Sequence, residues 1–143
     1  GAPVSLQLKF GGTNSNFNMP IIVQAPEGAQ KIEGILLPLL NIQKINSNLN
    51  QIGFYAQSLF ALNKSYSSLC NRGLLNGYLA TYGTDLVKLN SDTMDRGATK
   101  TTCLAGIQSY CLSTQLADGT YLCIDSAGAS GTTQCVSAQT ICK

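Results

Sequence analysis

One apolar stripe through residues 41–70 constrains the fold of this chain more than any other feature. Its apolar residues recur at intervals of three or four positions: Ile42, Ile45, Leu49, Ile52, Ala56, Leu59, Leu62 and Tyr66. That spacing predicts one face of an α-helix of about seven turns. The opposite face is polar and carries Gln43, Lys44, Asn48, Asn50, Gln51, Gln57 and Asn63. Because a helix of this kind must bury its apolar face, we expect a layered fold.

The C-terminal third of the chain is the predicted partner of this helix. Residues 107–116 and 121–126 have strand character and flank Asp118-Gly119, a dipeptide typical of tight hairpin turns. After a glycine-containing turn at residues 127–131, the remaining candidate strands are residues 132–136 and 139–142. The predicted fold is therefore α+β, with a long amphipathic helix packed on a small antiparallel sheet of three or four strands and stabilised by disulfides.

Shorter segments lie between the long helix and the sheet. The long helix is expected to end within residues 65–70, where serines accumulate before Cys70. Apolar residues at helical spacing then predict a second helix of about three turns over residues 74–82, with Gly83 as its C-terminal stop. Residues 84–88 either extend that helix or form a turn, and the polar residues 90–102 are expected to form a loop.

Residues 1–40 are predicted to form an N-terminal segment ahead of a globular head at residues 41–143. Alternating apolar residues predict a strand at residues 3–10, and a second short strand is expected at residues 19–25, so that the two pair as a hairpin. Gly1-Ala2 is interpreted as a tag remnant. A helical lead-in follows at residues 29–40, where Pro38 predicts either a kink or a main helix that begins beyond it. The apolar run 35–40 is too short to span a membrane, so we favour a buried helix segment over a contact with a helical partner.

Cysteine usage indicates an exported protein. The cysteines are even in number and none shows the Cys-x-x-Cys spacing of a zinc or redox centre, which predicts a disulfide framework and an oxidising compartment. They are Cys70, Cys103, Cys111, Cys123, Cys135 and Cys142. The chain has no histidine, which excludes Ser-His-Asp and Cys-His catalysis and every histidine-containing metal site. We predict that the protein is not an enzyme and has neither catalytic residues nor a cofactor.

Five aspartates are the candidate ligands for a metal ion: Asp85, Asp92, Asp95, Asp118 and Asp125. Such carboxylates can bind calcium, but no EF-hand spacing is present. We therefore interpret them as turn and helix-cap residues and predict no metal site. Asp125 in particular is expected to shape the turn that follows it.

A basic face is the candidate for nucleic-acid binding, and it would comprise Arg72, Lys88, Arg96, Lys100 and Lys143. The net charge is only +2, and the chain lacks both a basic run and aromatic residues interleaved with basic ones, so DNA binding is not favoured. Four tyrosines are interpreted as core or rim residues rather than ligand platforms: Tyr78, Tyr82, Tyr110 and Tyr121.

Two motifs, taken in their order along the chain, resemble the sequence pattern of a known protein family. The first closes the long helix with a tyrosine-containing turn, an Asn-x-Ser-Tyr step and a cysteine: Gln51, Ala56, Phe60, Asn63, Ser65, Tyr66 and Cys70. The second has a strand, a glycine turn, an aromatic residue and a Cys-Ile-Asp-Ser-x-Gly run: Leu116, Gly119, Tyr121, Cys123, Ile124, Asp125, Ser126 and Gly128. With Cys142 near the C-terminus, residues 45–143 resemble type IV pilins and the pseudopilins of type II secretion. The hydrophobic first half of the pilin helix is missing, and residues 3–40, Cys111 and Cys135 have no counterpart in the common pattern.

The resemblance also suggests disulfide pairs. In the simpler pattern of the family the cysteine at the helix end meets the next one, which implies Cys70–Cys103. For the other four cysteines we prefer Cys123–Cys142 with Cys111–Cys135. The alternative is a short Cys135–Cys142 loop with Cys111–Cys123 across the hairpin.

The function implied by the resemblance is structural. Such a chain would be a major or minor subunit of a bacterial type IV pilus or related fibre, acting in cell-surface adhesion and motility. Pilins are held in the inner membrane by the missing helix, then cleaved, methylated and polymerised outside the cell. Expected partners are other pilin subunits and a host or abiotic surface, with the membrane reached only through the missing helix. The alternative is a binding module, a minor pilin or pseudopilin head that recognises DNA, a surface or a secretion substrate.

Reduction is expected to loosen the C-terminal sheet before the long helix melts, because each disulfide that closes a long loop stabilises the fold by about 2–4 kcal/mol. Thermal unfolding of oxidised and reduced protein, followed by circular dichroism, measures the effect. Equal melting temperatures would contradict the disulfide framework.

Overall fold

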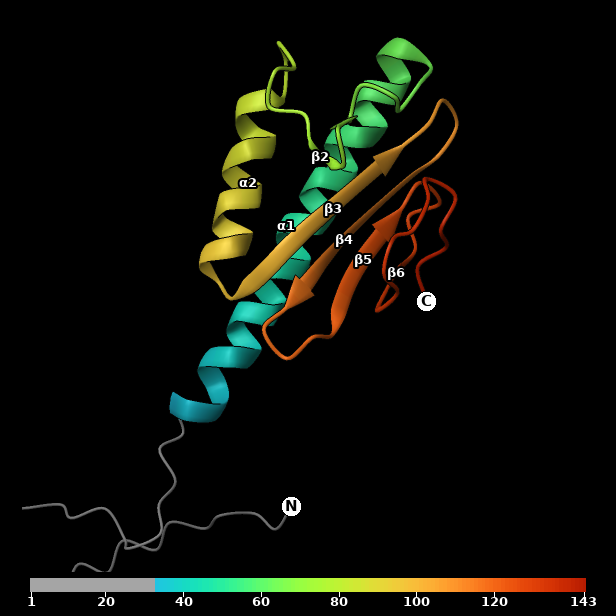
Figure 1. Cartoon of the computed structure of the whole chain (residues 1–143). Helices are drawn as coiled ribbons and strands as arrows, with labels where there is room; N and C mark the ends of the chain where they lie inside the picture. The colour runs from blue at the N-terminus through green and yellow to red at the C-terminus, as the bar shows by residue number, and fades with distance from the viewer. Residues whose placement is uncertain (1–32) are drawn as a thin grey trace, which may run out of the picture. The chain divides into compact units, whose positions relative to one another are not determined.

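The computed structural model describes residues 33–143, with side chains from residue 36 onward. This part of the chain forms two helices and two antiparallel sheets, so the predicted α+β class is confirmed. Figure 1 shows how these elements are arranged. The strands predicted at residues 3–10 and 19–25 lie outside the described residues.

The first helix, α1 (Glu33–Asn63), starts earlier than one of the two sequence-based alternatives allowed. It begins before Pro38 and continues through it, so a main helix that starts beyond Pro38 is wrong. Pro38 lies in the second turn, where its missing N–H removes a single backbone hydrogen bond to the carbonyl of Gly34. The helix therefore continues through Pro38 with one backbone hydrogen bond fewer.

α1 also ends earlier than predicted, at Asn63 rather than within residues 65–70. The next residue, Lys64, has a left-handed backbone with φ of 54°, and its N–H donates to the carbonyl of Phe60 at 2.8 Å. This geometry closes a helix C-terminus in the way that glycine or asparagine usually does. Tyr66 is buried as the stripe predicted, but it lies in the loop after the helix.

The apolar stripe of α1 is largely buried, as predicted. Its fully buried members are Ile45, Leu49, Ile52, Ala56 and Leu59, whereas Ile42 is half-buried. Leu62 is 68% exposed, and its assignment to the stripe was wrong. At about 100° per residue, Leu62 is rotated roughly a quarter turn away from the centre of the stripe. Asn48, assigned to the polar face, lies at the edge of the stripe and is buried.

The helix predicted at residues 74–82 is absent, and a short hairpin occupies its start. Strands β1 (Cys70–Asn71) and β2 (Leu74–Leu75) pair around Arg72 and Gly73, whose φ angles are 52° and 83°. Two successive left-handed residues reverse the chain and prevent a helix here. The Cys103 N–H donates to the carbonyl of Gly73 at 2.9 Å, which holds the hairpin against the larger sheet.

The second helix, α2 (Gly83–Asp95), begins at the glycine that was predicted to end a helix. A Cβ atom on Gly83 would collide with the backbone carbonyl of Gly77, so only glycine allows this close approach. The predicted loop at 90–102 is also wrong, because α2 occupies its first part and strand β3 (Ala98–Ala105) its last. Thr93 takes a buried position on α2, so apolar periodicity alone was too weak to predict the helix.

The larger sheet has the order β3-β4-β5-β6, with every neighbouring pair antiparallel. Its remaining strands are β4 (Tyr110–Leu116), β5 (Tyr121–Asp125) and β6 (Ser130–Gly131). The Asp118-Gly119 turn joins β4 to β5 as predicted, and Gly119 has φ of 85°. The strands predicted at 132–136 and 139–142 are wrong: the chain after β6 is irregular, and the Thr132 N–H donates to the carbonyl of Lys143.

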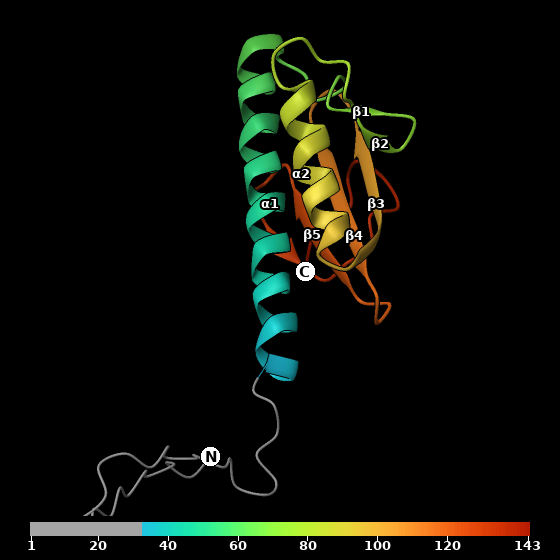
Figure 2. The same ribbon diagram turned by 90° about the vertical axis from the view of Figure 1, so that its left-hand side faces the viewer.

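The larger sheet separates two buried clusters, because side chains alternate between its two faces. Figure 2 shows α1 and α2 on one side of the sheet, and Tyr110, Leu112 and Ile124 share a cluster with the stripe of α1. The other cluster contains Cys111, Cys123, Cys135 and Cys142. The C-terminal segment thus supplies the second layer, and β4 is buried on both faces.

A buried polar contact joins the two helices. The Asn48 side-chain amide of α1 donates to Asp92 Oδ2 at 2.7 Å and to Thr93 Oγ1 at 3.2 Å, both on α2. Arg96 Nε also donates to Asp92, at 3.1 Å from Oδ2. The hydrogen bond from Asn48, followed by that from Arg96, lowers the pKa of Asp92.

We predict that Asn48→Ala lowers the free energy of unfolding by about 1–3 kcal/mol, because it removes the hydrogen bonds that Asp92 and the buried Thr93 accept from Asn48. The Asp92 carboxylate stabilises the fold above its ordinary pKa of about 4, and this contribution is lost as pH falls through its lowered pKa. The effect of the substitution should therefore be larger at neutral pH than in acid. Urea unfolding of both proteins at several pH values measures it.

The exposed Asn50, two residues further along α1, provides the control for this substitution. Asn50→Ala should leave the unfolding midpoint unchanged. Equal midpoints for Asn48→Ala and Asn50→Ala at neutral pH would refute the stabilising role of the contact between the helices.

Candidate assembly surface

Three disulfides tie the head together, and they are the three pairs that were preferred: Cys70–Cys103, Cys111–Cys135 and Cys123–Cys142. The first joins β1 to β3, next to the loop that leaves α1. The other two attach the irregular C-terminal segment to the adjacent strands β4 and β5. Such bonds indicate an oxidising compartment of the extracellular type.

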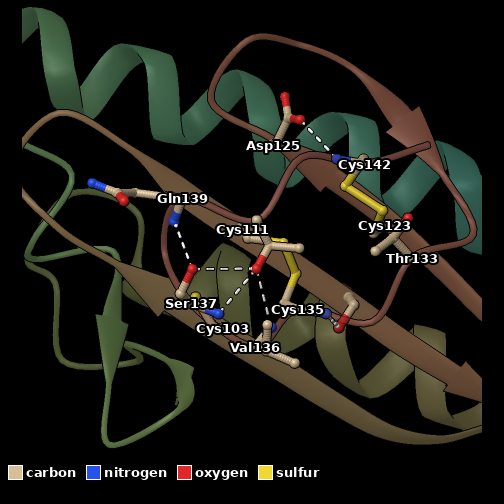
Figure 3. Close-up of a disulfide and its surroundings, with 12 residues drawn as sticks. Cys103, Cys111, Cys123, Asp125, Thr133, Cys135, Val136, Ser137, Gln139 and Cys142 are labelled. Atoms are coloured by element: carbon tan, nitrogen blue, oxygen red, sulfur yellow. Dashed lines mark hydrogen bonds between the residues drawn. A yellow bond between two sulfur atoms is a disulfide. The ribbon is translucent and has the colours of Figure 1, made fainter.

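Asp125 anchors the C-terminal segment from within the sheet (Figure 3). Its Oδ1 accepts hydrogen bonds from the N–H groups of Ala127 and Ala129 at 2.9 and 3.1 Å. Its Oδ2 accepts one from the N–H of Cys142 at 3.0 Å. The predicted turn-shaping role is therefore confirmed, and the contact with Cys142 is an addition that only the tertiary structure could supply.

Residues 135–142, which lie between two disulfide-bonded cysteines, form a loop that we call the C-terminal disulfide loop. Hydrogen bonds from its own polar side chains order this loop, and Figure 3 shows some of them. Thr140 Oγ1 accepts hydrogen bonds from the N–H groups of Val136 and Ser137 at 3.1 and 3.0 Å. The side chains of Val136 and Ile141 remain exposed. The loop therefore presents apolar groups outward from a fixed backbone.

The remaining predicted aspartates do not come together. Asp85 lies in the first turn of α2, Asp92 contacts Asn48, and Asp95 ends the helix. Asp118 shapes the β4–β5 turn, where hydrogen bonds from the Thr120 hydroxyl and then from its N–H lower the pKa of the aspartate. Within residues 36–143 no group of three or more histidine, cysteine, aspartate or glutamate side chains is placed to hold a metal ion.

The five predicted basic residues divide between separate sites. Arg72 and Lys100 line one hollow beside the β1–β2 hairpin. Lys88 and Arg96 line another, between α1 and α2, where Arg96 pairs with Asp92. Lys143 is exposed at the C-terminal residue. The five residues therefore do not form one continuous basic face. The hollow beside the hairpin has two cations, whereas the hollow between the helices has three, with Lys44 the third, and also contains Asp85 and Asp92.

The four tyrosines differ in their surroundings. Tyr110 is buried against Tyr66, with ring centroids 5.0 Å apart, and this burial raises its pKa. Tyr82 is half-buried and stacks on Tyr55, and Tyr121 is half-buried in β5. Tyr78 is 92% exposed, so its prediction as a core or rim residue is wrong. It follows the β1–β2 hairpin, where no neighbour covers its ring.

The N-terminal part of α1 carries the most continuous exposed apolar surface on the helix. Four leucines within two turns are between 49% and 62% exposed: Leu36, Leu37, Leu39 and Leu40. We call them the leucine collar. The favoured prediction that this run is a buried helix segment is wrong, because all four side chains are exposed and this end of α1 extends past the strands (Figure 1).

A shallow hollow of about 290 Å³ continues the leucine collar toward the sheet. Its lining includes Leu37 and Ile42 from α1 and Leu116 and Ala117 from the end of β4. Residues 34–43 contain no charged side chain, so nothing in this part of α1 opposes burial. An exposed apolar surface of this kind is a candidate contact site.

Sequence reasoning had no means of finding several of these features. Asn48 was assigned to the solvent face because polar residues usually lie there. The left-handed backbone at Arg72 carried no signal, since arginine is not a typical turn residue. The collar was recognised as an apolar run, but its exposure depends on where the sheet ends.

Comparison of the chain with protein-family models, with curated proteins and with solved structures found no match. The pilin resemblance therefore depends on the motifs within the chain itself. Neither α1 nor α2 combines the length and the apolar character that a membrane crossing requires.

We predict that Asp125→Asn destabilises the C-terminal segment by about 1–3 kcal/mol. Both carboxylate oxygens now accept hydrogen bonds from backbone N–H groups. In asparagine one of these oxygens is replaced by NH₂, which cannot accept such a bond, so at least one N–H loses its acceptor in either orientation of the amide. Denaturant unfolding gives the free energy, and hydrogen exchange at the Cys142 amide reports the local opening.

Asp118→Asn is the matched control, because Thr120 donates only to Oδ1 of an exposed carboxylate and the amide can keep that oxygen in place. We expect its unfolding midpoint to change much less than that of Asp125→Asn, because the Asp118 carboxylate is exposed. If Asp125→Asn behaved in the same way, the anchoring role of Asp125 would be wrong.

Proposed function

We propose that this chain is the head of a structural fibre subunit of the type IV pilin class. The observation that carries the proposal is the division of α1 into two parts. From Ile45 to Leu59 one stripe is buried in the protein's own core, whereas the leucine collar is uncovered. A partner outside the described residues is therefore needed to cover the collar.

The composition of the collar supports a helical partner in a fibre. Leucines on about half of the helix circumference suit packing between helices, where such side chains interdigitate at close distance. In the family that the chain resembles, a long helix connects each head to a fibre core made of its neighbours. The proposed partners are thus other copies of the same kind of subunit.

The chemistry of the head supports a location outside the cell. Two of the three disulfides attach a C-terminal segment that has little regular structure of its own beyond β6, and the third joins β1 to β3. Stapling of this kind stabilises a small domain exposed to the medium. In the proposed function the mature subunit lies in a cell-surface fibre that contacts host or abiotic surfaces, after an inner-membrane stage.

The double substitution Leu36→Glu/Leu40→Glu tests the proposal, because two charges on the collar would oppose its burial between helices. In cells that express the native gene with this change, we expect at least tenfold less of the chain in the sheared fibre fraction. Quantitative mass spectrometry of that fraction measures incorporation. The melting temperature of the head should not change, because both side chains are already exposed.

Leu62→Glu is the matched control, since Leu62 is also an exposed leucine of α1 but lies at its opposite end. This variant should enter fibres normally. The proposal is refuted if the unmodified chain is absent from sheared fibres, or if the doubly substituted chain enters them at the normal level.

A further inference from the structure

A second surface feature, unrelated to the leucine collar, lies beside the β1–β2 hairpin. It is a hollow of about 480 Å³ that we call the hairpin hollow. Three elements supply its lining, which includes Arg72, Leu74, Asn90, Met94, Thr99 and Lys100. These elements are the hairpin, α2 and β3, which lie side by side in Figures 1 and 2.

The hairpin hollow carries positive charge without a balancing carboxylate. Arg72 and Lys100 are both exposed, and no residue of the lining is acidic. Among the described side chains the salt bridge recorded is Arg96–Asp92, which is not part of this hollow. Two cations on one concave surface favour an anionic ligand.

Arg72 is held in place by unusual backbone geometry. Its φ of 52° lies in the left-handed region, where a side chain other than glycine, asparagine or aspartate is strained. The Cys70–Cys103 disulfide and the Gly73–Cys103 hydrogen bond secure the turn on both sides. Strain that the surrounding structure enforces in this way is typical of positions where a side chain is presented to a ligand.

Polar groups in the hollow match a ligand with hydroxyl groups. The Oδ1 atom of Asn90 is buried and receives no hydrogen bond within the described structure. A buried carbonyl oxygen requires a donor, which a hydroxyl group provides and a simple anion does not. The Thr99 hydroxyl donates to the carbonyl of Gln115, which leaves its oxygen free to accept a hydrogen bond.

The shape and apolar lining match a ring. Leu74 and Met94 give the hairpin hollow an apolar wall. Arg72 and Leu74 also line a neighbouring hollow of about 410 Å³ that includes Tyr78, whose ring is exposed. A pocket with an apolar surface and a few convergent polar groups is typical of small-ligand sites.

We propose that the hairpin hollow binds an acidic saccharide. The carboxylate or sulfate group contacts Arg72 and Lys100, the ring hydroxyls donate to Asn90 and Thr99, and a ring face packs on Leu74. Single-stranded nucleic acid fits less well, because its sites combine a basic groove along the backbone with several aromatic side chains for stacking. The hairpin hollow has two cations and no aromatic residue in its own lining.

Isothermal titration of the 143-residue chain with defined oligosaccharides tests the proposal. The probes are oligogalacturonate and a sulfated galactan oligosaccharide, with a neutral galactan oligosaccharide and a single-stranded oligonucleotide as comparisons. We expect at least one of the two acidic saccharides to bind at least tenfold more tightly than either comparison. Which of the two binds better identifies carboxylate or sulfate as the preferred group.

Arg72→Asn is the decisive variant, because asparagine is favoured at this turn position and removes the cation without disturbing the backbone. Lys100→Gln removes the other cation. Each substitution should weaken acidic-saccharide binding at least tenfold. Lys64→Asn is the matched control, since Lys64 is also an exposed cation with a left-handed φ, of 54°, but lies outside the hollow.

Unchanged folding of the three variants is verified by their melting temperatures. The proposal is overturned if neither acidic saccharide binds, if the neutral saccharide binds equally well, or if the oligonucleotide binds more tightly. It is also overturned if Arg72→Asn binds like Lys64→Asn. None of these results depends on fibre assembly, so they are separate from the test of the proposed function.

Discussion

The burial of β4 from both faces is the constraint on which the rest of the structure depends. One face meets the apolar stripe of α1 through Tyr110 and Leu112. The other face needs a second layer, and no further helix is described that could supply it. The C-terminal segment takes this role although it forms only two residues of strand, because two disulfides and the Asp125 carboxylate hold it in place. Covalent bonds here replace the packing area that regular structure would otherwise provide.

The same arrangement explains why part of α1 remains uncovered. A small sheet covers only a limited length of a 31-residue helix, so the sheet leaves the N-terminal part of the helix uncovered. Leucines in that part are costly to expose, which supports a partner and agrees with the proposed fibre role. The hairpin hollow lies at a different place on the head, beside β3 and α2, and its charges suit a soluble ligand. Assembly and ligand binding would therefore use separate surfaces of one rigid head.

Side-chain spacing and turn residues predicted those elements whose structure depends on neighbouring residues in the sequence. The stripe of α1 and the Asp118-Gly119 hairpin follow from side-chain periodicity and turn preference. The resemblance to pilins implied only the Cys70–Cys103 pair, and the other two pairs were preferred over one alternative. α2 was missed because Thr93 occupies an inward position although its side chain is polar. β3 was missed for the same reason, because the polar Thr101 is buried in it. Likewise, Asn48 is buried only because Asp92 and Thr93 lie opposite it. The residue pattern of one helix or strand does not show which side chains of another element will contact it.

The sequence by itself determined the α+β class, the long helix and the need for disulfides, because each depends on residue type and spacing along one stretch of chain. Only the tertiary structure decided which residues of those stretches are covered. The leucine collar is exposed because the sheet ends above it, and Arg72 meets Lys100 because the Cys70–Cys103 disulfide brings the hairpin to β3. Both candidate surfaces are thus products of contacts between segments distant in the chain, and such contacts are set by the packing of the whole head.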